Sequence, residues 1–306
     1  MTGQIKAVCT STVRGTQKRN IQTADFTTDW GLVGDAHGGD WHRQVSLISY
    51  EKIQAFNAKG ASVNHGDFGE NIVAEGIDFK SLPIGTRLLS NDCILEITQI
   101  GKECNNHCQI YTRMGDCIMP REGVFAKVIQ NGVISCGDYM TAVTGLEYTA
   151  AVLTLSDRGF KGEREDESGK TAVSFLEAAG YIVLSKKILP DNRKEIEEFL
   201  INVSDKIAPD ILITTGGTGF SPRDVTPEAT LAVAHRLAPG ISEGIRANSP
   251  AKAMLSRGAS VIRGKTLIIN LPGSPAAVRE SLEYVLPHLR HGIDVLRGEV
   301  LECVKK

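Results

Sequence analysis

The sequence predicts two domains, a mostly-β barrel at residues 1–144 and an α/β domain at residues 145–306 with a mostly parallel sheet in a three-layer sandwich. Three observations support this prediction. The 306 residues are enough for two hydrophobic cores of ordinary size. In the first half, short apolar or alternating runs are punctuated by glycines, a pattern typical of barrels. In the second half, strands alternate with helical segments, which is typical of a parallel sheet covered on both faces.

Composition narrows the function classes. Hydrophobic residues make up 42% and charged residues 23%, as in ordinary globular proteins. The formal net charge of −2 gives no reason to expect nucleic acid as a partner. Because no apolar run has the length of a membrane helix and no signal peptide is recognisable, we expect no membrane partner and a cytoplasmic location. The seven cysteines are then expected to be thiols or ligands rather than disulfides.

The first half is predicted to contain few helices. Four strands are expected at Ile5–Cys9, Val45–Ser49, Ile94–Ile100 and Val124–Ile129. Asn131-Gly132 predicts a two-residue hairpin between the last of these strands and the apolar pair that follows. One short helix is expected at Glu51–Ala58, with Ile53 and Phe56 on its inner face.

Two glycine-rich segments and a cysteine cluster interrupt this half. Residues 31–39 and 66–72 read as turns, because glycine allows positive φ and Asp or Asn bonds back to the backbone. Four potential zinc ligands lie close in sequence: Cys104, His107, Cys108 and Cys117. Their spacing matches neither of the usual paired patterns, so zinc and a reactive thiol both remain open. The other cysteines are expected to be plain buried thiols: Cys9, Cys93, Cys136 and Cys303.

The second half alternates strands and helices. Strands are expected at Tyr148–Ser156, Tyr181–Leu189, Ile211–Thr215, Val261–Ile262 and Thr266–Leu271. One helix is predicted to start at Ser168 as a cap, and another to follow a capping box at Asn192. The second of these carries an amphipathic stripe: Ile196, Phe199, Leu200, Val203 and Ile207. Further helices are expected within residues 241–256 and from Ala276 onward.

The segment 210–230 is the centre of the functional argument. A buried strand is followed by Gly216, Gly217 and Gly219, and then by a helix with Thr226 as its predicted N-cap. This order of elements favours the binding of anionic oxygens. It is not a Walker loop, which needs a lysine, and it is not the dinucleotide fingerprint, because Pro222 replaces the third glycine.

Polar residues follow each strand of the expected parallel sheet. Arg223-Asp224, just beyond the glycines, suits a metal-assisted nucleotide reaction, although an exposed ion pair in a plain turn is the alternative. The other turns are Ser156-Asp157, Asp191 and Asn270–Pro275. Because the carboxyl ends of parallel strands share one edge, we expect these four turns to gather there.

The motif Thr214–Gly219, with Ser221–Glu228, resembles the signature of the molybdopterin adenylyltransferase family, which includes the G domain of gephyrin. The resemblance extends from Glu147 to the C-terminus. Members of the family bind molybdopterin and adenylylate its terminal phosphate with Mg-ATP, which prepares the pterin for molybdate insertion. The resemblance therefore implies molybdopterin and ATP as substrates, Mg²⁺ as cofactor, and no pyridoxal phosphate. It also implies a homo-oligomer, a trimer in family relatives, and the molybdate-insertion enzyme as a partner.

The same resemblance assigns roles to single residues. Asp191 and Asp224 match the acidic positions of the family and are expected to be catalytic, holding Mg²⁺ through ATP. Asp157 is a weaker candidate that could instead cap its turn, and Asp191 could simply stabilise a helix N-terminus. The remaining residues expected to bind substrate are Ser156, Ser168, Gly216, Gly217, Thr218, Gly219, Arg223, Asn270, Pro272, Gly273 and Ser274.

The first half resembles a MOSC domain, the module named for the C-terminus of molybdenum cofactor sulfurase. Gly34-Asp35, residues 66–72, the cysteine near Gly115 and residues 132–138 carry this resemblance, which covers residues 4–141. Such domains are β-barrels that bind the molybdenum cofactor or carry sulfur on a cysteine. Cys108 is the expected cysteine, with Cys104 and Cys117 as alternatives, and a thiolate suits both molybdenum and a persulfide. A protein that only binds or carries the cofactor, or carries sulfur, is the alternative to an enzyme.

Overall fold

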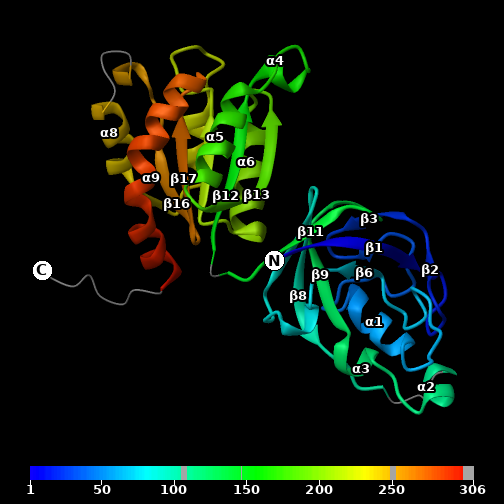
Figure 1. Cartoon of the computed structure of the whole chain (residues 1–306). Helices are drawn as coiled ribbons and strands as arrows, with labels where there is room; N and C mark the ends of the chain where they lie inside the picture. Colours follow the sequence, from blue (N-terminus) through cyan, green and yellow to red (C-terminus); the bar gives the residue numbers. More distant parts are fainter. Residues whose placement is uncertain (105–108, 146, 249–252, 299–306) are drawn as a thin grey trace, which may run out of the picture. The chain divides into compact units, whose positions relative to one another are not determined.

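A computed structural model describes residues 1–104, 109–145, 147–248 and 253–298 of the chain (Figure 1). The chain divides into two compact units, Met1–Leu146 and Glu147–Lys306. Each unit has a hydrophobic core of its own. Among the described residues, no helix combines the length and the apolar character needed to cross a membrane.

The N-terminal unit is a β-barrel. Seven strands close it, because β1 pairs with β11 at the two ends of the order β11-β7-β8-β9-β5-β6-β1. These strands are β1 (Thr2–Thr10), β5 (Val45–Ser49), β6 (Ile72–Glu75), β7 (Arg87–Ser90), β8 (Cys93–Ile100), β9 (Val124–Gln130) and β11 (Tyr139–Val143). Within the described part of the barrel, β5 and β6 are the one pair of strands that runs parallel. The short strand β2 (Arg19–Asn20) pairs antiparallel with the last two residues of β1 and is not part of the closed barrel.

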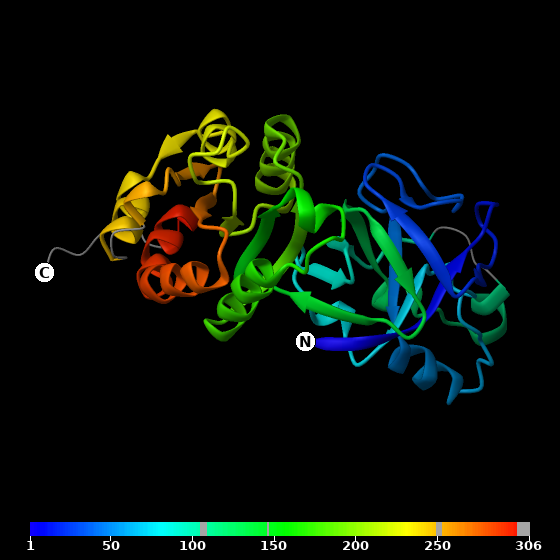
Figure 2. The ribbon, with the colours of Figure 1, turned by 90° about the horizontal axis from the view of Figure 1, so that it is seen from above.

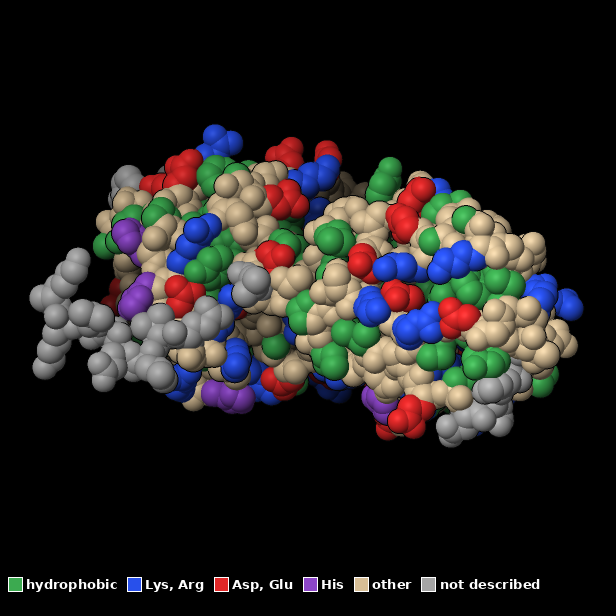
Figure 3. All heavy atoms as spheres, turned by 60° about the horizontal axis from the view of Figure 1, so that its bottom comes forward, with side chains coloured by type: hydrophobic (Ala, Val, Ile, Leu, Met, Phe, Trp, Pro, Cys, Tyr) green, Lys and Arg blue, Asp and Glu red, His purple; other side chains and the backbone are tan. Residues whose placement is uncertain are grey.

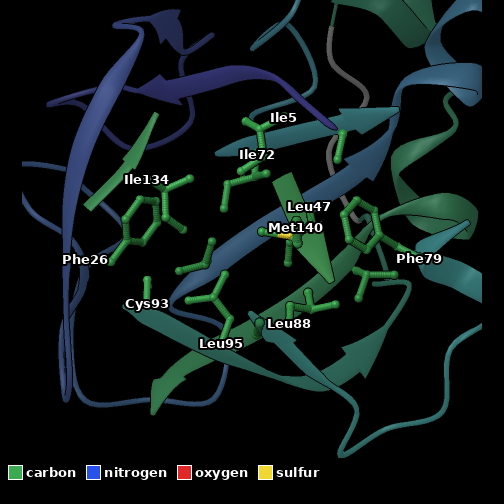
Figure 4. Packing of buried hydrophobic residues seen from close by; sticks show 14 of the residues in the cluster. Ile5, Phe26, Leu47, Ile72, Phe79, Leu88, Cys93, Leu95, Ile134 and Met140 are labelled. Carbon is green, nitrogen blue, oxygen red and sulfur yellow. The ribbon is translucent and has the colours of Figure 1, made fainter. Parts of the chain in front are cut away.

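Apolar side chains from all sides fill the barrel (Figure 4). Phe26, Leu47, Ile72, Leu95 and Met140 are almost completely buried. Burial of one such side chain contributes about 1.5–3 kcal/mol to stability, so the closed core does not depend on any single contact. The alternation that predicted strands in this half therefore corresponds to inward and outward faces of the barrel wall.

Helix α1 (Tyr50–Asn57) is shifted by one residue from the predicted helix and buries Ile53 and Phe56 as expected. Three further helical turns were not predicted: η1 (Phe79–Ser81), α2 (Gln109–Met114) and α3 (Met119–Glu122). Each is too short to show a helical periodicity in sequence.

The hairpin predicted at Asn131-Gly132 is wrong. Strand β10 (Gly132–Ser135) pairs with β3 (Thr23–Thr27) in a separate small sheet that also contains β4 (Gly31–Leu32). The side-chain carbonyl of Asn131 accepts a 2.7 Å hydrogen bond from Thr28 N. A Cβ at Gly132 would lie 2.5 Å from the backbone nitrogen of Cys93. Glycine is therefore required here for close approach of two strands, not for a tight turn.

The C-terminal unit is built on a six-stranded sheet in the order β13-β12-β14-β17-β16-β15. Its strands are β12 (Tyr148–Leu155), β13 (Tyr181–Leu189), β14 (Ile211–Thr215), β15 (Arg236–Leu237), β16 (Ser260–Arg263) and β17 (Thr266–Leu271). Strands β13, β12, β14 and β17 are parallel, whereas β16 and β15 pair antiparallel. The sheet is thus mixed, with three parallel and two antiparallel strand pairings, and the predicted parallel arrangement is limited to β13, β12, β14 and β17. The turn at Gly264 (φ 57°) is too short for a crossover helix, so β16 and β17 must run antiparallel.

Helices lie on both sides of this sheet (Figure 2). They are α4 (Asp157–Phe160), α5 (Glu167–Ala178), α6 (Arg193–Asn202), α7 (Thr226–Ala232), α8 (Pro239–Asn248) and α9 (Pro275–Arg297), with the π-helical turn η2 (Val203–Ile207) and the 3₁₀ turn η3 (Ala253–Leu255). One buried cluster joins the sheet to α5, α8 and α9 through Leu176, Ile245 and Leu282. Most of the predicted stripe of α6 and η2 is buried, including Ile196 and Leu200.

Charge is evenly mixed on the face drawn in Figure 3. Lys and Arg side chains lie among Asp and Glu side chains over both units on that face. This mixture agrees with the small formal net charge of −2.

Candidate functional site

The site lies at the carboxyl edge of the C-terminal sheet. In the strand registers, Leu155 is opposite Leu189, and Thr215 is opposite both Thr154 and Leu271. The last residues of β12, β13, β14 and β17 are therefore level with one another. As a result, the four turns that follow these strands start side by side, as the sequence predicted.

Gly216 opens the loop after β14 with a φ of 96°. Its N–H donates to Leu271 O at 3.1 Å, which ties the loop to the end of β17. A Cβ at Gly216 would collide with the carbonyl oxygen of Leu155, and a Cβ at Gly273 would lie 3.3 Å from the Cα of Gly216. The turns after three strands are thus in direct backbone contact, and side chains are excluded between them.

Gly217 and Gly219 bring the same loop against two carboxylates. Gly217 has a φ of 62°, and a Cβ there would lie 3.0 Å from Oδ1 of Asp191. A Cβ at Gly219 would lie 2.9 Å from Oδ2 of Asp224. Asp191 and Asp224 therefore flank the glycine loop, although they are 33 residues apart in sequence.

Helix α7 starts differently from the prediction. Val225 is the residue before the helix, Thr226 is its first residue, and no side chain caps the N-terminus. The hydroxyl of Thr226 instead donates to Gly216 O at 3.0 Å, and Thr226 N donates to Gly217 O at 3.2 Å. Thr226 therefore fastens the glycine loop to the start of the helix rather than capping it.

Three acidic side chains and one arginine form the charged part of the site. The backbone N–H of Asp191 donates to Oδ1 of Asp157 at 3.2 Å, and Arg223 Nη2 donates to Oδ2 of Asp157 at 2.5 Å. The hydrogen bond from Arg223 lowers the pKa of Asp157. Burial, with a smaller effect of the charges of Asp157 and Asp224, raises the pKa of Asp191. Oδ1 of Asp191 is buried and has no hydrogen-bond partner among the described residues.

The carboxylate arrangement fits a cation that takes further ligands from a substrate and water. Within the described residues, no group of three or more His, Cys, Asp or Glu side chains could hold a metal ion alone. Two carboxylates with phosphate oxygens and water are, however, a usual ligand set for Mg²⁺. The buried Oδ1 of Asp191, which has no hydrogen-bond partner among the described residues, is suited to be one of these magnesium ligands, because a cation would compensate its negative charge.

Asp224 is held in place by the loop around it. Its Oδ2 accepts a 2.9 Å hydrogen bond from Ser221 N. A cavity of about 390 Å³ opens beside it, lined by Phe220, Ser221, Pro222, Asp224, Val225, Glu228 and Arg257.

Arg257 was not predicted as a site residue, yet it donates hydrogen bonds to three carbonyl oxygens of this loop. Its Nε donates to Gly219 O at 2.7 Å, its Nη2 donates to Asp224 O at 2.5 Å, and its Nη1 pairs with Glu228. Its backbone N–H also donates to Thr218 O. Most of the predicted site residues follow a strand, whereas Arg257 precedes β16. Its only signal was an arginine between Ser256 and Gly258, which is ordinarily an exposed position.

Two of the predicted substrate-binding residues lie at helix starts, but only one of them caps its helix. The side chain of Ser156 accepts from Gly159 N at 3.0 Å and caps α4. Ser168 does not cap α5: the cap is Asp166, which accepts from Gly169 N at 2.7 Å. Ser168 is buried, and its Oγ lies 3.3 Å from Thr215 Oγ1.

Asn270 was expected to line the wall of the site, but its side chain is buried with all its groups engaged. Its Nδ2 donates to Thr214 and Thr230 hydroxyls, each at 2.9 Å, and its Oδ1 accepts from Ala259 N at 3.1 Å. Asn270 lies on β17, between β14 and β16, and its side chain is therefore bonded inside the unit instead of lining the wall of the site. Ser274 is exposed and caps α9 by accepting from Ala277 N at 3.3 Å.

The other predicted residues of this edge differ in burial. Thr218 is buried, Pro272 is half-buried, and Arg223 and Gly273 are exposed. The exposed members of the set remain available for a substrate, while Thr218 can contribute mainly through its backbone.

The N-terminal unit has its own cavity, of about 840 Å³. Of the three candidate cysteines, Cys104 is exposed, Cys117 is buried, and both line this cavity. Cys108 and the possible zinc ligand His107 lie outside the described residues, as does Cys303.

The remaining cysteines are structural. Burial raises the pKa of Cys9 and of Cys93 to about 12, so neither forms a thiolate at neutral pH. Cys136 is half-buried rather than buried, and its thiol donates to Lys6 O at 3.0 Å.

Comparison with known proteins agrees with this geometry. Two family models match the chain, "Probable molybdopterin binding domain" over residues 151–291 and "MOSC domain" over residues 34–141. A molybdopterin adenylyltransferase from Helicobacter pylori is 41% identical over 162 residues, which is 51% of this chain and 91% of the relative. The chain belongs to the molybdopterin adenylyltransferase family.

Two further relatives each align with about half of this chain. Gephyrin from Dictyostelium discoideum is 36% identical over 166 residues, which is 50% of this chain and 23% of gephyrin. The solved structure of the molybdopterin biosynthesis enzyme MoaB from Thermus thermophilus is 41% identical and covers 49% of this chain and 97% of its own, with a TM-score of 0.48. Both resemblances predicted from the motifs, to this family and to the MOSC domain, are confirmed.

Proposed function

We propose that the C-terminal unit adenylylates molybdopterin with Mg-ATP, as a step of molybdenum cofactor biosynthesis. An oxygen of the pterin phosphate attacks the α-phosphorus of ATP, the bond from the α-phosphorus to the bridging oxygen breaks, and pyrophosphate leaves. The pterin phosphate is itself the nucleophile, so the reaction needs positioning and charge compensation rather than a protein nucleophile.

The observation that carries this proposal is the pairing of a glycine loop with Asp191 and Asp224. The loop would present backbone N–H groups to anions, whereas the carboxylates on its flank repel them. Both features are satisfied together if a cation lies between the carboxylates and a phosphate. Asp191 and Asp224 would hold Mg²⁺, which when bound would neutralise charge on the triphosphate.

The remaining residues of the edge take positioning roles. The backbone of Gly216–Gly219 would bind the pterin side, and Pro272, Gly273 and Ser274 would form the opposite wall. Arg223 is exposed and bound to Asp157, so it would meet a phosphate at the open side of the site. Asn270 and Ser168 would act indirectly, by holding the strands and α5 in place.

Adenylyl transfer can be measured as pyrophosphate release with molybdopterin, ATP and Mg²⁺. We expect Asp224→Asn to lower kcat by about 10²–10³-fold while molybdopterin still binds, because a charge at the reacting phosphates is lost. Glu198→Gln makes the same chemical change on the exposed face of α6 and should leave kcat unaltered. Unchanged turnover in Asp224→Asn would remove its proposed role, and pterin binding without any pyrophosphate release would favour the non-catalytic carrier.

For the N-terminal unit we propose that it binds the molybdenum cofactor or carries sulfur on a cysteine. The position of Cys104 and Cys117 on one cavity supports this role. Serine variants of Cys104, Cys108 and Cys117 would be compared for molybdenum and persulfide retention. We expect Cys108→Ser to abolish retention; loss in Cys104→Ser or Cys117→Ser alone would move the assignment.

The assembly is also a proposal. From the family resemblance we propose a homo-oligomer, a trimer, that hands its product to a molybdate-insertion enzyme. Light scattering of the purified chain would measure its mass in solution, and a monomer would contradict the trimer.

A further inference from the structure

Two buried threonines lie at the carboxyl ends of β12 and β14. Thr154 and Thr215 are directly opposite each other in the parallel register of these strands. The residues two and four positions before each threonine are apolar and belong to the core that also contains Ala172 and Leu176 of α5. Because side chains alternate between the two faces of a strand, both hydroxyls lie on this same face of the sheet. Buried hydroxyls at these two positions require a hydrogen-bond acceptor nearby.

Asp166 supplies this acceptor at the start of α5. Its Oδ2 accepts from Thr154 Oγ1 at 2.8 Å. Its Oδ1 accepts from Gly169 N at 2.7 Å, which caps the helix, and from Ser168 Oγ at 3.3 Å. Ser168 Oγ in turn accepts from Thr215 Oγ1 at 3.3 Å. One carboxylate therefore connects the start of α5 to the ends of two strands.

The carboxylate gives this chain of hydroxyls a fixed direction. An ionised carboxylate can only accept hydrogen bonds, so the hydroxyl of Ser168 donates to Asp166 and its oxygen is left to accept from Thr215. Lys170, the cation of α5, pairs with Glu165 instead. Hydrogen bonds to a charged acceptor are stronger than those between neutral groups, so Asp166 holds the whole chain in one arrangement.

Close packing at Gly169 restricts Asp166 further. A Cβ at Gly169 would lie 2.1 Å from Oδ2 of Asp166 and 2.5 Å from Thr154 Oγ1. Glycine at this position therefore lets the first turn of α5 approach both side chains. Three donors and this close approach together hold the carboxylate in one place.

The residues that Asp166 holds lead directly into the candidate site. Thr215 is followed by Gly216, the first residue of the glycine loop. The hydroxyl of Thr226 holds Gly216 from the start of α7, by donating to Gly216 O at 3.0 Å. The start of the loop is thus connected to two helices, to α5 through Thr215 and Ser168 and to α7 through Thr226.

We propose that Asp166 is a positioning residue for adenylyl transfer, which fixes the start of the glycine loop through Ser168 and Thr215. Its role is indirect, because the groups that it binds belong to the protein itself. This inference rests on the proposed function for its kinetic test, whereas the position of the loop can be followed without turnover.

Asp166→Asn separates positioning from helix capping. Asparagine caps helices about as well as aspartate, so the unfolding temperature should stay close to that of the wild type. Its amide can also donate, however, so the hydroxyls lose the charged acceptor and their fixed direction. We expect kcat for pyrophosphate release to fall by about tenfold, with KM for ATP almost unchanged. Glu167→Gln removes the same charge from an exposed position in the first turn of α5 and should leave kcat unaltered.

A double-mutant cycle tests the connection through Thr215. Thr215→Val keeps the shape of the side chain and removes its hydroxyl, and it should lower kcat by a factor similar to that of Asp166→Asn. In the Thr215→Val background, Asp166→Asn should then lower kcat by about twofold or less, because the chain is already broken. Independent, multiplying losses of kcat would show that the two residues act separately and would overturn the proposed connection.

Hydrogen exchange followed by mass spectrometry provides a measurement that needs no substrate. In Asp166→Asn, the amides of residues 216–219 should exchange about tenfold faster than in the wild type, while those of α9 keep their rates. Unchanged exchange in this loop, or an unchanged kcat, in the folded variant overturns the role of Asp166. If the wild-type chain released no pyrophosphate, the adenylyl-transfer proposal would fail, whereas faster exchange in the variant would still support the hold of Asp166 on the loop.

Discussion

The backbone N–H of Asp191 donates a hydrogen bond to the carboxylate of Asp157, with a distance of 3.2 Å. This bond joins the turn after β13 to the turn after β12. The second oxygen of Asp157 accepts from Arg223 on the glycine loop, so one carboxylate connects three of the turns at the sheet edge. Asp157 therefore positions two other candidate residues, whatever contact it makes with a substrate.

Replacement of Asp157 separates its two roles. Asp157→Asn keeps an acceptor for the N–H of Asp191 but removes the charge that holds Arg223, and we expect kcat/KM for adenylyl transfer to fall by about threefold. Asp157→Ala loses both contacts and should lower kcat/KM by about tenfold or more. Pyrophosphate release measures both. If the two variants were equally active, the bond to Asp191 would have no part in positioning.

We expect the ionised side chain of Asp191 to lower the stability of the free protein. Its pKa is raised, chiefly by burial, so the folded chain resists ionisation of this carboxyl. Below its unfolded pKa the group is neutral in both states and costs nothing. As pH rises through the folded pKa, the carboxylate must form in an unfavourable place and wild-type stability falls.

Asp191→Asn should therefore raise the unfolding temperature at pH 7.5 and lower kcat by about 10²-fold. The gain in unfolding temperature should disappear near pH 3, where the wild-type carboxyl is protonated. Differential scanning calorimetry without ATP at both pH values provides the measurement. A variant that is less stable than wild type at pH 7.5 would show that Asp191 makes favourable contacts in the free protein.

How far the sequence predicted this site depends on the kind of contact. Strand order and the shared edge followed from the alternation of elements, so Asp157, Asp191, Gly216 and Gly273 were expected together. Arg257 and Thr226 were missed or misassigned because their partners are backbone carbonyls of a loop whose path the sequence does not fix. A strand was predicted at Val261–Ile262, but its antiparallel direction was not, because the short turn to β17 was not used to decide it. The predicted Asn131-Gly132 hairpin was wrong because tertiary pairing of β10 with β3 overrode the local signal.

Gly217 should not tolerate a side chain. Its φ of 62° is unfavourable for alanine, and a Cβ would meet Thr226 and Oδ1 of Asp191. We expect Gly217→Ala to destabilise the C-terminal unit by about 1–3 kcal/mol and to abolish most pyrophosphate release. Gly240 in α8 is the matched control, because a Cβ there has open space; Gly240→Ala should be neutral or slightly stabilising and fully active. Equal effects at both glycines would contradict a special requirement in the loop.

Arg257 is expected to act as a positioning residue for Asp224. Its guanidinium holds the carbonyl oxygens of Gly219 and Asp224, so it fixes the loop from behind without reaching the carboxylate itself. Arg257→Met should lower kcat by about 10–10²-fold, because Asp224 would sample positions away from the reacting phosphates, with a smaller effect on KM for ATP. Arg257→Lys keeps one donor and should recover part of kcat.

Arg263 provides the comparison that separates positioning from stability. It also binds a carboxylate, Asp205, and a backbone carbonyl, that of Val233, but it lies on the antiparallel strand β16. Arg263→Met should therefore lower the unfolding temperature while kcat stays near the wild-type value. If both arginine variants lost stability and kcat in proportion, Arg257 would be a structural residue only. If Arg257→Met loses kcat while its unfolding temperature is almost unchanged, the guanidinium of Arg257 holds the loop in position and contributes little to the stability of the fold.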